Sequence, residues 1–145
     1  MDIVRIKEFE KIESDIRECS SDLFDQTLNQ IEKIAFIAKK YSDFACFVEL
    51  REEEELAGII AFYCNDFKQK DAFLSMIVIK KQYQKRGIGK ILLGYMEDEC
   101  KKIGMKSIKL EVAKANMNAQ KFYLRMGYRL DHEEKESIFM CKEIG

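Results

Sequence analysis

The most apolar stretch of the chain is residues 72–79 (AFLSMIVI), in which a single serine interrupts a run of hydrophobic side chains. A short run of this kind is typical of a central strand whose two faces are both covered. Segments in which apolar residues alternate with polar ones, or which are short and apolar, predict further strands. These are residues 2–7 (DIVRIK), 44–50 (FACFVEL), 56–63 (LAGIIAFY), 107–112 (SIKLEV) and 137–144 (SIFMCKEI), with one more near 128–132.

Four other segments repeat their apolar residues at the spacing of an amphipathic helix. They are residues 10–20, 29–41, 89–103 and 118–126. Asn29, with Glu32 three positions later, is suited to cap the second of these helices. Gly104 and Gly127 follow the last two, where glycine commonly ends a helix.

The order of these elements is βααβββαβαβ, and it predicts the fold class. The link at 50–56, which holds an acidic turn from Glu52 to Glu55, and the link at 64–71 are short enough for hairpins, whereas the helix at 89–103 is a crossover between strands. We therefore expect an α/β fold with a mixed central β-sheet flanked by helices, in a single domain that covers residues 1–145.

The composition narrows the class of protein. Lys plus Arg number 25 and Asp plus Glu 26, so no general attraction to nucleic acid or to an anionic membrane is expected. The first residues lack the apolar core of a signal peptide, and no stretch approaches the ~20 apolar residues of a membrane helix. The five cysteines are scattered without a CxxC pair, which disfavours both a metal site and a disulfide framework. We expect a cytoplasmic protein without a metal.

The segment most indicative of chemistry is residues 84–90 (QKRGIGK), between the central strand and the helix that follows it. Backbone amides at a helix start lack partners and carry a partial positive charge, so they are suited to hold a phosphate. Residues 80–90 contain five basic side chains and no acidic one. The Walker and dinucleotide patterns do not fit, since Ile91 follows Lys90 and Leu92 stands at the third glycine position. From the loop alone, a plain strand-to-helix turn with solvated lysines stays open.

Two blocks of sequence resemble the signatures of GNAT acetyltransferases. Gln84-x-x-Gly87-x-Gly89 is similar to the Gln/Arg-x-x-Gly-x-Gly/Ala loop of that family, and LEVAKANMNAQKFYLRMGY is similar to its second signature. The residues that match in the second block are Asn116, Ala119, Tyr123, Gly127 and Tyr128. The spacing between the blocks also matches, and the resemblance covers about residues 71–144. Lys81 and Lys85 depart from it, because many members have proline and a small residue there.

The resemblance implies a GNAT-like fold and an acetyl-CoA-dependent N-acetyltransferase in which a primary amine attacks the thioester directly in a ternary complex. It also implies that the strands 72–79 and 107–112 splay apart to receive pantetheine, while the loop amides hold the pyrophosphate. The cofactor-binding residues that it implies are Ile77, Val78, Ile79, Gln84, Lys85, Arg86, Gly87, Ile88, Gly89, Lys90, Asn116, Ala119, Phe122 and Tyr123.

The resemblance further implies two catalytic residues. Tyr123 occupies the position of the acid that protonates the departing thiolate, with a core tyrosine as the other interpretation. Glu111, twelve residues earlier, resembles the base of members that acetylate protein N-termini, although alternation would also let it pair with Lys109 in solvent. Glu49 is the second candidate for the base, and His132 is expected on a late loop without a role. Asn116 has a rival role as a helix cap.

The acceptor is not fixed by these residues. The absence of a long acidic or aromatic peptide groove favours a small-molecule amine such as an amino sugar. A protein N-terminus or lysine, a longer acyl donor and a CoA-binding module without turnover stay open as alternatives. A homodimer is also open, with the strand 137–144 as a contributing segment.

Overall fold

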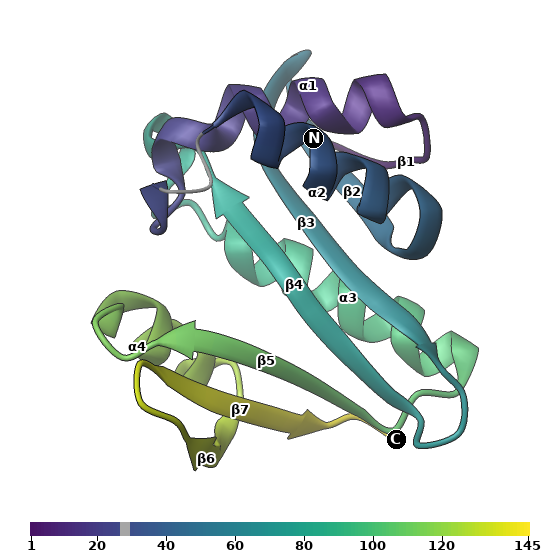
Figure 1. The fold of residues 1–145 in the computed structure, drawn as a ribbon, viewed down its shortest axis with the longest axis vertical. Coiled ribbons are helices and arrows are strands. Elements are labelled where there is room, and N and C mark those ends of the chain that lie inside the picture. The colour runs from purple at the N-terminus through teal and green to yellow at the C-terminus, as the bar shows by residue number, and fades with distance from the viewer. Residues whose placement is uncertain (27–29) are drawn as a thin grey trace.

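The computed structural model describes residues 1–26 and 30–145, and within them the chain forms a seven-stranded sheet with the order β1-β2-β3-β4-β5-β7-β6 (Figure 1). The strands are β1 (Asp2–Ile6), β2 (Cys46–Glu52), β3 (Glu55–Asp66), β4 (Asp71–Ile79), β5 (Ser107–Ala113), β6 (Arg129–Glu133) and β7 (Ser137–Glu143). Neighbouring strands are antiparallel except β4 and β5, which are parallel. The predicted mixed sheet is confirmed, including the additional short strand before the last one.

The helices of the described residues are α1 (Phe9–Cys19), α2 (Ile31–Phe44), α3 (Ile88–Ile103) and α4 (Met117–Arg125), with short 3-10 turns η1 (Ser20–Asp22) and η3 (Lys81–Tyr83). The second helix begins at Ile31 after Gln30, whose side chain makes no capping hydrogen bond. Asn29, the predicted cap, lies outside the described residues. Within residues 1–26 and 30–145, no helix is long and apolar enough to cross a bilayer.

Two hydrophobic cores lie on the two faces of the sheet. Helices α1 and α2 cover the face of β2, β3 and β4 that is turned toward the viewer in Figure 1, and α3 crosses the opposite face. The buried residues that these helices contribute include Ile12, Ile16, Ile34 and Ala38 on one face and Leu92, Leu93 and Met96 on the other. Each large side chain buried in this way stabilises the fold by about 1.5–3 kcal/mol, so the middle strands are held from both sides.

Strand β4 departs from the prediction that both of its faces are buried. Phe73 is 36% exposed, and Ser75 is exposed as well. The register against β3 shifts at this point, because Ala61 pairs with Met76 while the next residue, Phe62, pairs with Leu74. Ser75 is therefore the extra residue of a β-bulge, which bends the strand and reverses the alternation of its faces. Leu74 packs on the α3 side and Met76 on the α1–α2 side.

The predicted acidic hairpin between β2 and β3 is confirmed. Its two turn residues, Glu53 and Glu54, have φ angles of 49° and 72°, as both central residues of a type I′ turn require. Asparagine and glycine adopt these angles with less strain than glutamate does. The hairpin therefore places two glutamates in a conformation that their side chains do not favour.

The two edges of the sheet are β1 and β6. Strand β7 lies between β5 and β6, with both of its edges hydrogen-bonded to neighbours. An interior strand has no free backbone groups, so the segment 137–144 could contribute to a homodimer only through its side chains. His132 also lies in a strand, β6, rather than on the loop that was expected.

Candidate active site

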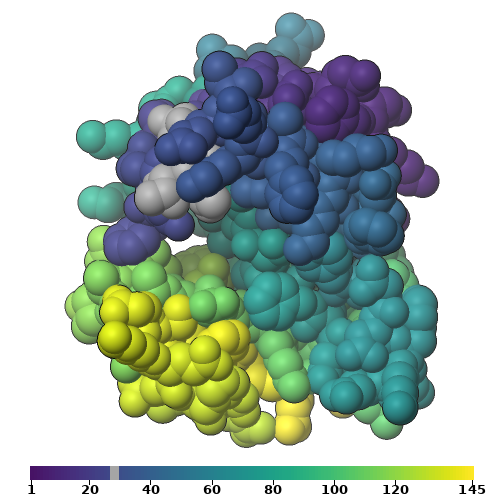
Figure 2. Space-filling view, in the orientation of Figure 1, coloured from purple at the N-terminus to yellow at the C-terminus, as the bar shows by residue number. Residues whose placement is uncertain are grey.

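The parallel strands β4 and β5 are paired only over their first halves. Asp71–Leu74 pairs with Ser107–Leu110, and the strands then separate where the Ser75 bulge bends β4. The separation opens toward α4 and the start of α3 in Figure 1, and Figure 2 shows the surface hollowed between the purple-to-blue N-terminal part and the green-to-yellow C-terminal part. The predicted splaying of these strands is confirmed, and the ends of β4 and β5 form the two sides of the site.

Helix α3 begins at the mouth of this opening. Its N-cap, Gly87, has a left-handed backbone with φ of 81°, and the first backbone hydrogen bond of the helix runs from the Ile91 N–H to the Gly87 carbonyl. The amides of the first turn precede this bond and are free to bind an anion. Nothing lies within 4 Å of the position that a Cβ of Gly87 would take, so the backbone faces open space. Lys85 also has a positive φ, 65°, which explains why small residues suit this position.

The basic side chains of the loop differ in their partners. Lys80 is held by Glu18 of α1 at 2.8 Å between Nζ and Oε2, so one of the five predicted cations is neutralised. Among the described residues no carboxylate pairs with Lys81, Lys85, Arg86 or Lys90. Arg86 lies over the ring of Tyr83, 5.4 Å from its centroid. The loop therefore keeps a net positive charge on an exposed surface, as a phosphate site requires.

Glycine at position 89 brings α3 and α4 together. A Cβ on Gly89 would lie 3.1 Å from Cζ of Phe122, which is closer than side chains normally approach. Phe122 therefore packs against the first turn of α3, and Tyr123 follows it on α4. This contact places the predicted acid beside the predicted phosphate loop.

Tyr123 has a buried ring and an unengaged hydroxyl. The side chain is 7% exposed and its ring contacts those of Phe122 and Tyr128. No described residue forms a hydrogen bond with its hydroxyl. This oxygen is also not among the fully buried side-chain atoms that lack a partner, so it is not completely closed off from solvent. Burial raises the pKa of Tyr123 to about 12, so the phenol keeps its proton at neutral pH. A core tyrosine would be expected to satisfy its hydroxyl, and this one does not.

Asn116 and Gln84 make contacts with the protein itself. The Asn116 Oδ1 accepts a hydrogen bond from the Ala119 N–H at 3.2 Å, so the capping role weighed for this residue is confirmed. The Gln84 side chain donates to the carbonyl of Ile79 at 3.0 Å and thereby ties the loop to the end of β4. Ile77 and Ile79 are half-buried on the α3 side.

Glu111 lies on the face of β5 opposite to Leu110 and Val112, as alternation predicted. It is exposed, and its Oε2 accepts a hydrogen bond from the Ser137 hydroxyl at 2.6 Å. The alternative pairing with Lys109 is wrong, because the Lys109 ammonium lies 3.1 Å from Asp71. Glu111 thus faces the open side of the sheet, while Tyr123 packs with the core on the other side.

The other two candidates lie away from this opening. Glu49 is buried beneath α1, where its carboxylate binds Arg51 at 2.7 Å. Burial opposes its ionisation, but hydrogen bonds from Asp15 and Arg51 lower the pKa of Glu49, which makes it a weak base. His132 is exposed, stacks on Phe139 and contacts Asp131 at 2.7 Å. Within the described residues, no cluster of His, Cys, Asp and Glu is arranged to hold a metal ion.

Three residues that position the site were not found from the sequence. Ser75 forms the bulge that opens the strands, and its hydroxyl lies 2.8 Å from that of Tyr41. Glu18 and Asp22 contact the start of the loop at Lys80 and at the Lys81 N–H. The one polar residue within an apolar strand was a usable signal for Ser75. No local pattern marks the two acids, because their partners are about 60 residues away in the chain.

Comparison with known proteins places the chain in a family. Residues 8–128 match the acetyltransferase (GNAT) family. YxbD of Bacillus subtilis (strain 168) is 32% identical over 82 residues, which are 57% of this chain and 48% of YxbD. YyaT of the same organism is 36% identical over 78 residues, which are 50% of this chain and 51% of YyaT. The chain spans about half the length of these curated relatives.

Solved structures share the fold over nearly the whole chain. The PaiA N-acetyltransferase of Thermoplasma acidophilum, in complex with coenzyme A, has a TM-score of 0.78 at 19% identity and covers 99% of both chains. The ribosomal-protein-S18-alanine N-acetyltransferase of Escherichia coli has a TM-score of 0.82 at 18% identity, over 99% of this chain and 94% of its own. An aminoglycoside 6'-acetyltransferase type Ii has a TM-score of 0.81 at 18% identity, over 100% and 98%.

Proposed function

The chain belongs to the GNAT family of acetyltransferases, and we propose that it transfers the acetyl group of acetyl-CoA to the primary amine of a small molecule. Enzymes of this family use acetyl-CoA as the donor. The observation that carries the proposal is the left-handed backbone of Gly87 at the start of α3. It leaves the first backbone amides of the helix facing solvent, beside the separated ends of β4 and β5. We take residues 1–145 as one domain that performs this reaction.

The residues of the loop fit a pyrophosphate. Free amides at the start of α3 supply donors, and positive charge comes from four cations that pair with no carboxylate in residues 1–26 and 30–145. The amides of residues 85–90 would hold the pyrophosphate, and Gln84 would keep the loop in place through Ile79. The backbone of Ile77, Val78 and Ile79 would receive the pantetheine as an added strand, since β5 no longer pairs with this part of β4.

Around the acyl group, Phe122 would supply packing, and the capped start of α4 at Asn116 and Ala119 would form the adjoining wall. Acetyl-CoA supplies an activated thioester, so the protein needs to orient the amine, remove its proton and protonate the thiolate. Tyr123 would donate to the thiolate sulfur, because its hydroxyl is protonated and has no hydrogen-bond partner among the described residues. Glu111 would accept the proton of the amine, which has a pKa of about 10 in water.

The opposite placement of these two side chains supports a direct transfer. Glu111 faces the open side of β5, and Tyr123 belongs to the core on the α3 side. An amine that approaches a thioester between the strands from the open side would meet Glu111, while the thiolate would leave toward Tyr123. In a ternary complex of this kind the base and the acid do not compete for one position.

The acceptor class is the least constrained part of the proposal. Structures with this fold include one that acts on a ribosomal protein and one that acts on an aminoglycoside, so the fold does not select between them. We favour a small amine such as an amino sugar, because no long acidic or aromatic groove for a peptide is evident in the sequence. Acetylation of a protein N-terminus or lysine is the alternative, and a homodimer is compatible with either.

Thermal unfolding with acetyl-CoA, free CoA and ATP tests the cofactor. A ligand at about 100 times its dissociation constant stabilises by about 2.7 kcal/mol, which for a domain of this size is a rise in Tm of about 5–10 °C. We expect this rise with both CoA species and little change with ATP. No rise with either CoA species would refute the proposal. Thiol release in the presence of amino sugars or of peptides with a free N-terminus then identifies the acceptor class.

A further inference from the structure

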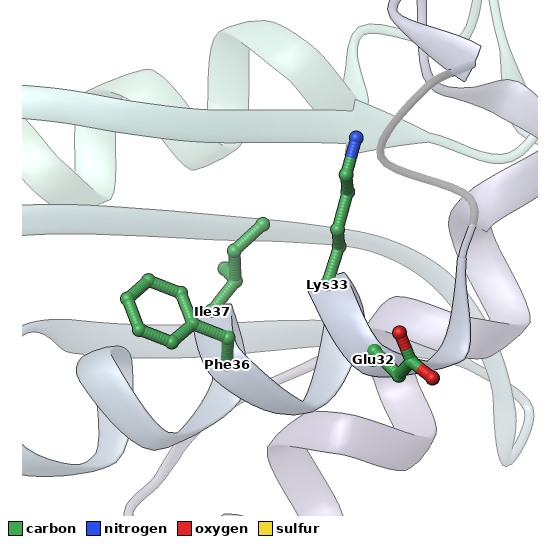
Figure 3. Close-up of a pocket in the computed structure, with 4 residues that line it drawn as sticks. All are labelled: Glu32, Lys33, Phe36 and Ile37. Atoms are coloured by element: carbon green, nitrogen blue, oxygen red, sulfur yellow. The ribbon is translucent and has the colours of Figure 1, made fainter.

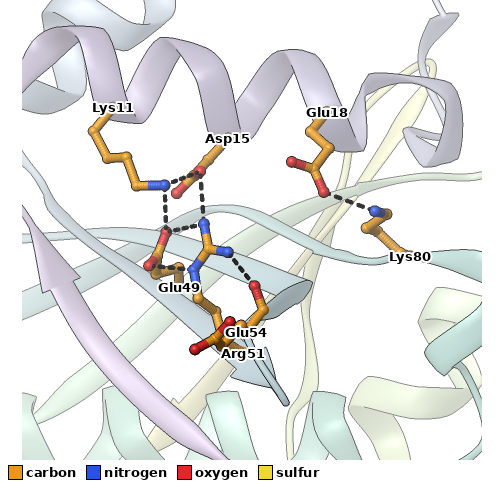
Figure 4. A network of polar contacts seen from close by, with 7 residues as sticks. All are labelled: Lys11, Asp15, Glu18, Glu49, Arg51, Glu54 and Lys80. Carbon is orange, nitrogen blue, oxygen red and sulfur yellow. Dashed lines mark hydrogen bonds and ion pairs between the residues drawn. The ribbon is translucent and has the colours of Figure 1, made fainter.

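A buried polar network joins helix α1 to strand β2 (Figure 4). Asp15 is 1% exposed and Glu49 is 3% exposed. The Lys11 ammonium lies 3.3 Å from Asp15 Oδ1 and 3.6 Å from Glu49 Oε2. Arg51 binds Glu49 through its Nε at 2.7 Å and donates a further hydrogen bond to the backbone carbonyl of Glu54. The carboxyl groups of Asp15 and Glu49 are thus both removed from water, and Arg51 donates mainly to that of Glu49.

The second oxygen of Asp15 lacks a partner. Asp15 Oδ2 is buried and accepts no hydrogen bond from the part of the chain that the structure describes. A buried oxygen without a partner costs about 1–3 kcal/mol, and more if it is charged. A proton on Asp15 would turn this oxygen into a donor toward the neighbouring Glu49 carboxylate, and the orphaned oxygen would be satisfied.

The pKa shifts of the two carboxyl groups have the directions that such a proton predicts. Burial, followed by the hydrogen bond to Glu49, raises the pKa of Asp15 to about 7. Burial acts in the same sense on Glu49, but hydrogen bonds from Asp15 and Arg51 prevail and lower the pKa of Glu49. Below about pH 7, one carboxyl group is therefore neutral and the other ionised.

The same helix holds the start of the phosphate loop. Glu18, one turn after Asp15 on α1, binds the Lys80 ammonium at 2.8 Å. Asp22 of η1 accepts a hydrogen bond from the Lys81 N–H at 3.3 Å. Lys80 directly follows β4, so both contacts act where the strand leads into the loop. Any change in the docking of α1 therefore reaches the loop through these two acids.

We propose that Asp15 and Glu49 share one proton that docks α1 on β2, and that Glu18 and Asp22 are positioning residues through which this docking orders the cofactor loop. Cofactor affinity then depends on the shared proton. This inference rests on the proposed function for the identity of the ligand, whereas the shared proton itself does not.

The groups around Asp15 fix the sign of the pH dependence. Those of α1 are Lys11, Glu18 and Cys19, and those of β2 are Glu49 and Arg51. Helix α2 and strand β3 contribute apolar side chains to the same layer. Lys11 lowers the pKa of Asp15, but it is 42% exposed and divides its ammonium between two carboxyl groups. Because the folded pKa of Asp15 lies above its ordinary value, the stabilisation is complete at low pH and is lost as the pH rises through about 7.

The first experiment addresses the proton without any ligand. Asp15→Asn keeps a donor toward Glu49 but cannot titrate, so it is compared with the wild type by thermal unfolding at pH 6 and pH 8. We expect the wild type to lose about 3–5 °C more than the variant over this interval. Carbon-13 NMR of the carboxyl groups in the wild type follows Asp15 directly and needs no variant. Equal losses of Tm, or an Asp15 midpoint near 4, would overturn the shared proton.

The second experiment addresses the link to the loop. Calorimetry with CoA at pH 6 and pH 8 should show a fall in affinity of up to about tenfold in the wild type beyond that in Asp15→Asn. The CoA phosphates titrate identically in both titrations and cancel in the comparison. Glu18→Gln should weaken binding about threefold at pH 6, whereas Glu13→Gln, which removes an acid that pairs with Arg17 on the same helix, should not.

The outcomes separate the two proposals. Equal pH dependence in the wild type and Asp15→Asn, or an unchanged affinity in Glu18→Gln, would overturn the link between α1 and the loop. If no form of the protein binds CoA at either pH, the proposed function fails and the link fails with it. The unfolding and NMR measurements still decide whether Asp15 and Glu49 share a proton in that case.

Discussion

The variant Tyr123→Phe separates a catalytic acid from a tyrosine that serves only the core. The ring would remain packed against Phe122 and Tyr128, and the hydroxyl that is lost has no partner among the described residues. The free energy of unfolding should therefore change by less than about 0.5 kcal/mol. The affinity for CoA should also stay the same, because the hydroxyl is not part of the phosphate loop.

The expected loss of turnover follows from the pKa of the phenol. A thiol has an ordinary pKa of about 8.5, whereas burial raises the pKa of Tyr123 to about 12. Complete proton transfer to the thiolate would then cost about 5 kcal/mol, so the phenol acts mainly by donating a hydrogen bond as the sulfur becomes negative. General acids contribute about 10²–10⁴-fold, and this mismatch favours the lower end. We expect kcat to fall about 100-fold.

Steady-state kinetics with a thiol reagent, together with calorimetry for CoA and thermal unfolding, measures all three quantities. Tyr128→Phe is the matched control, because its hydroxyl donates to Glu97 at 3.0 Å. That variant should lose about 1–2 kcal/mol of stability and keep its kcat. An unchanged kcat in Tyr123→Phe, or a loss of stability and CoA affinity as large as its loss of rate, would refute the reasoning.

Three further predictions concern the loop, the base and the hairpin. Gly89→Glu should weaken CoA binding about tenfold, because it adds bulk and negative charge at the start of α3. Gly94→Glu, at a position on the same helix with open space around it, should leave binding unchanged. Equal affinities of the two variants by calorimetry would show that the cofactor binds elsewhere. Glu111→Gln should lower kcat/KM about 100-fold at neutral pH and much less near pH 10, where about half of the amine is already neutral; a rate that stays at the wild-type value at neutral pH would exclude Glu111 as the base. Replacing Glu53 by Asn and Glu54 by Gly should stabilise the protein by about 1 kcal/mol, seen as a higher Tm, and an unchanged Tm would contradict the argument from positive φ.

The helices and strands could be predicted from the spacing of apolar residues, because each element buries its side chains at regular intervals. Helices α1, α2 and α3 each bury one face, and the strands next to them alternate or are continuously apolar. For strand β4 the apolar run predicted two fully buried faces, and this prediction is wrong. The Ser75 bulge changes which residues face each core and leaves Phe73 at the surface. A register shift of this kind depends on the partner strand and so is not encoded in the run itself.

Helix α2 shows a similar limit. The first turns of α2 carry Glu32, Lys33, Phe36 and Ile37, which line a hollow of about 330 Å³ (Figure 3). Phe36 is 72% exposed on this helix. The helical pattern predicted α2, but it gave no sign that Ile31, Phe36 and Phe44 would all stay on the surface, since exposure depends on what lies opposite the helix. The acceptor is difficult to infer for the same reason, because its binding surface is assembled from separate elements.

The cofactor loop was accessible to prediction because its chemistry is local. Gly87 adopts a positive φ at the N-cap of α3, and the amides that follow lack helical partners whatever the rest of the chain does. The pair formed by Asp15 and Glu49 is the opposite case, since 34 residues separate two acids that share one buried site. Each acid alone suggests only a solvated helix or strand position. Their proximity follows from the docking of α1 on β2, and only that docking reveals an oxygen that needs a proton. Local motifs therefore predict the part of this protein that binds the donor, and contacts between distant elements determine how firmly that part is held.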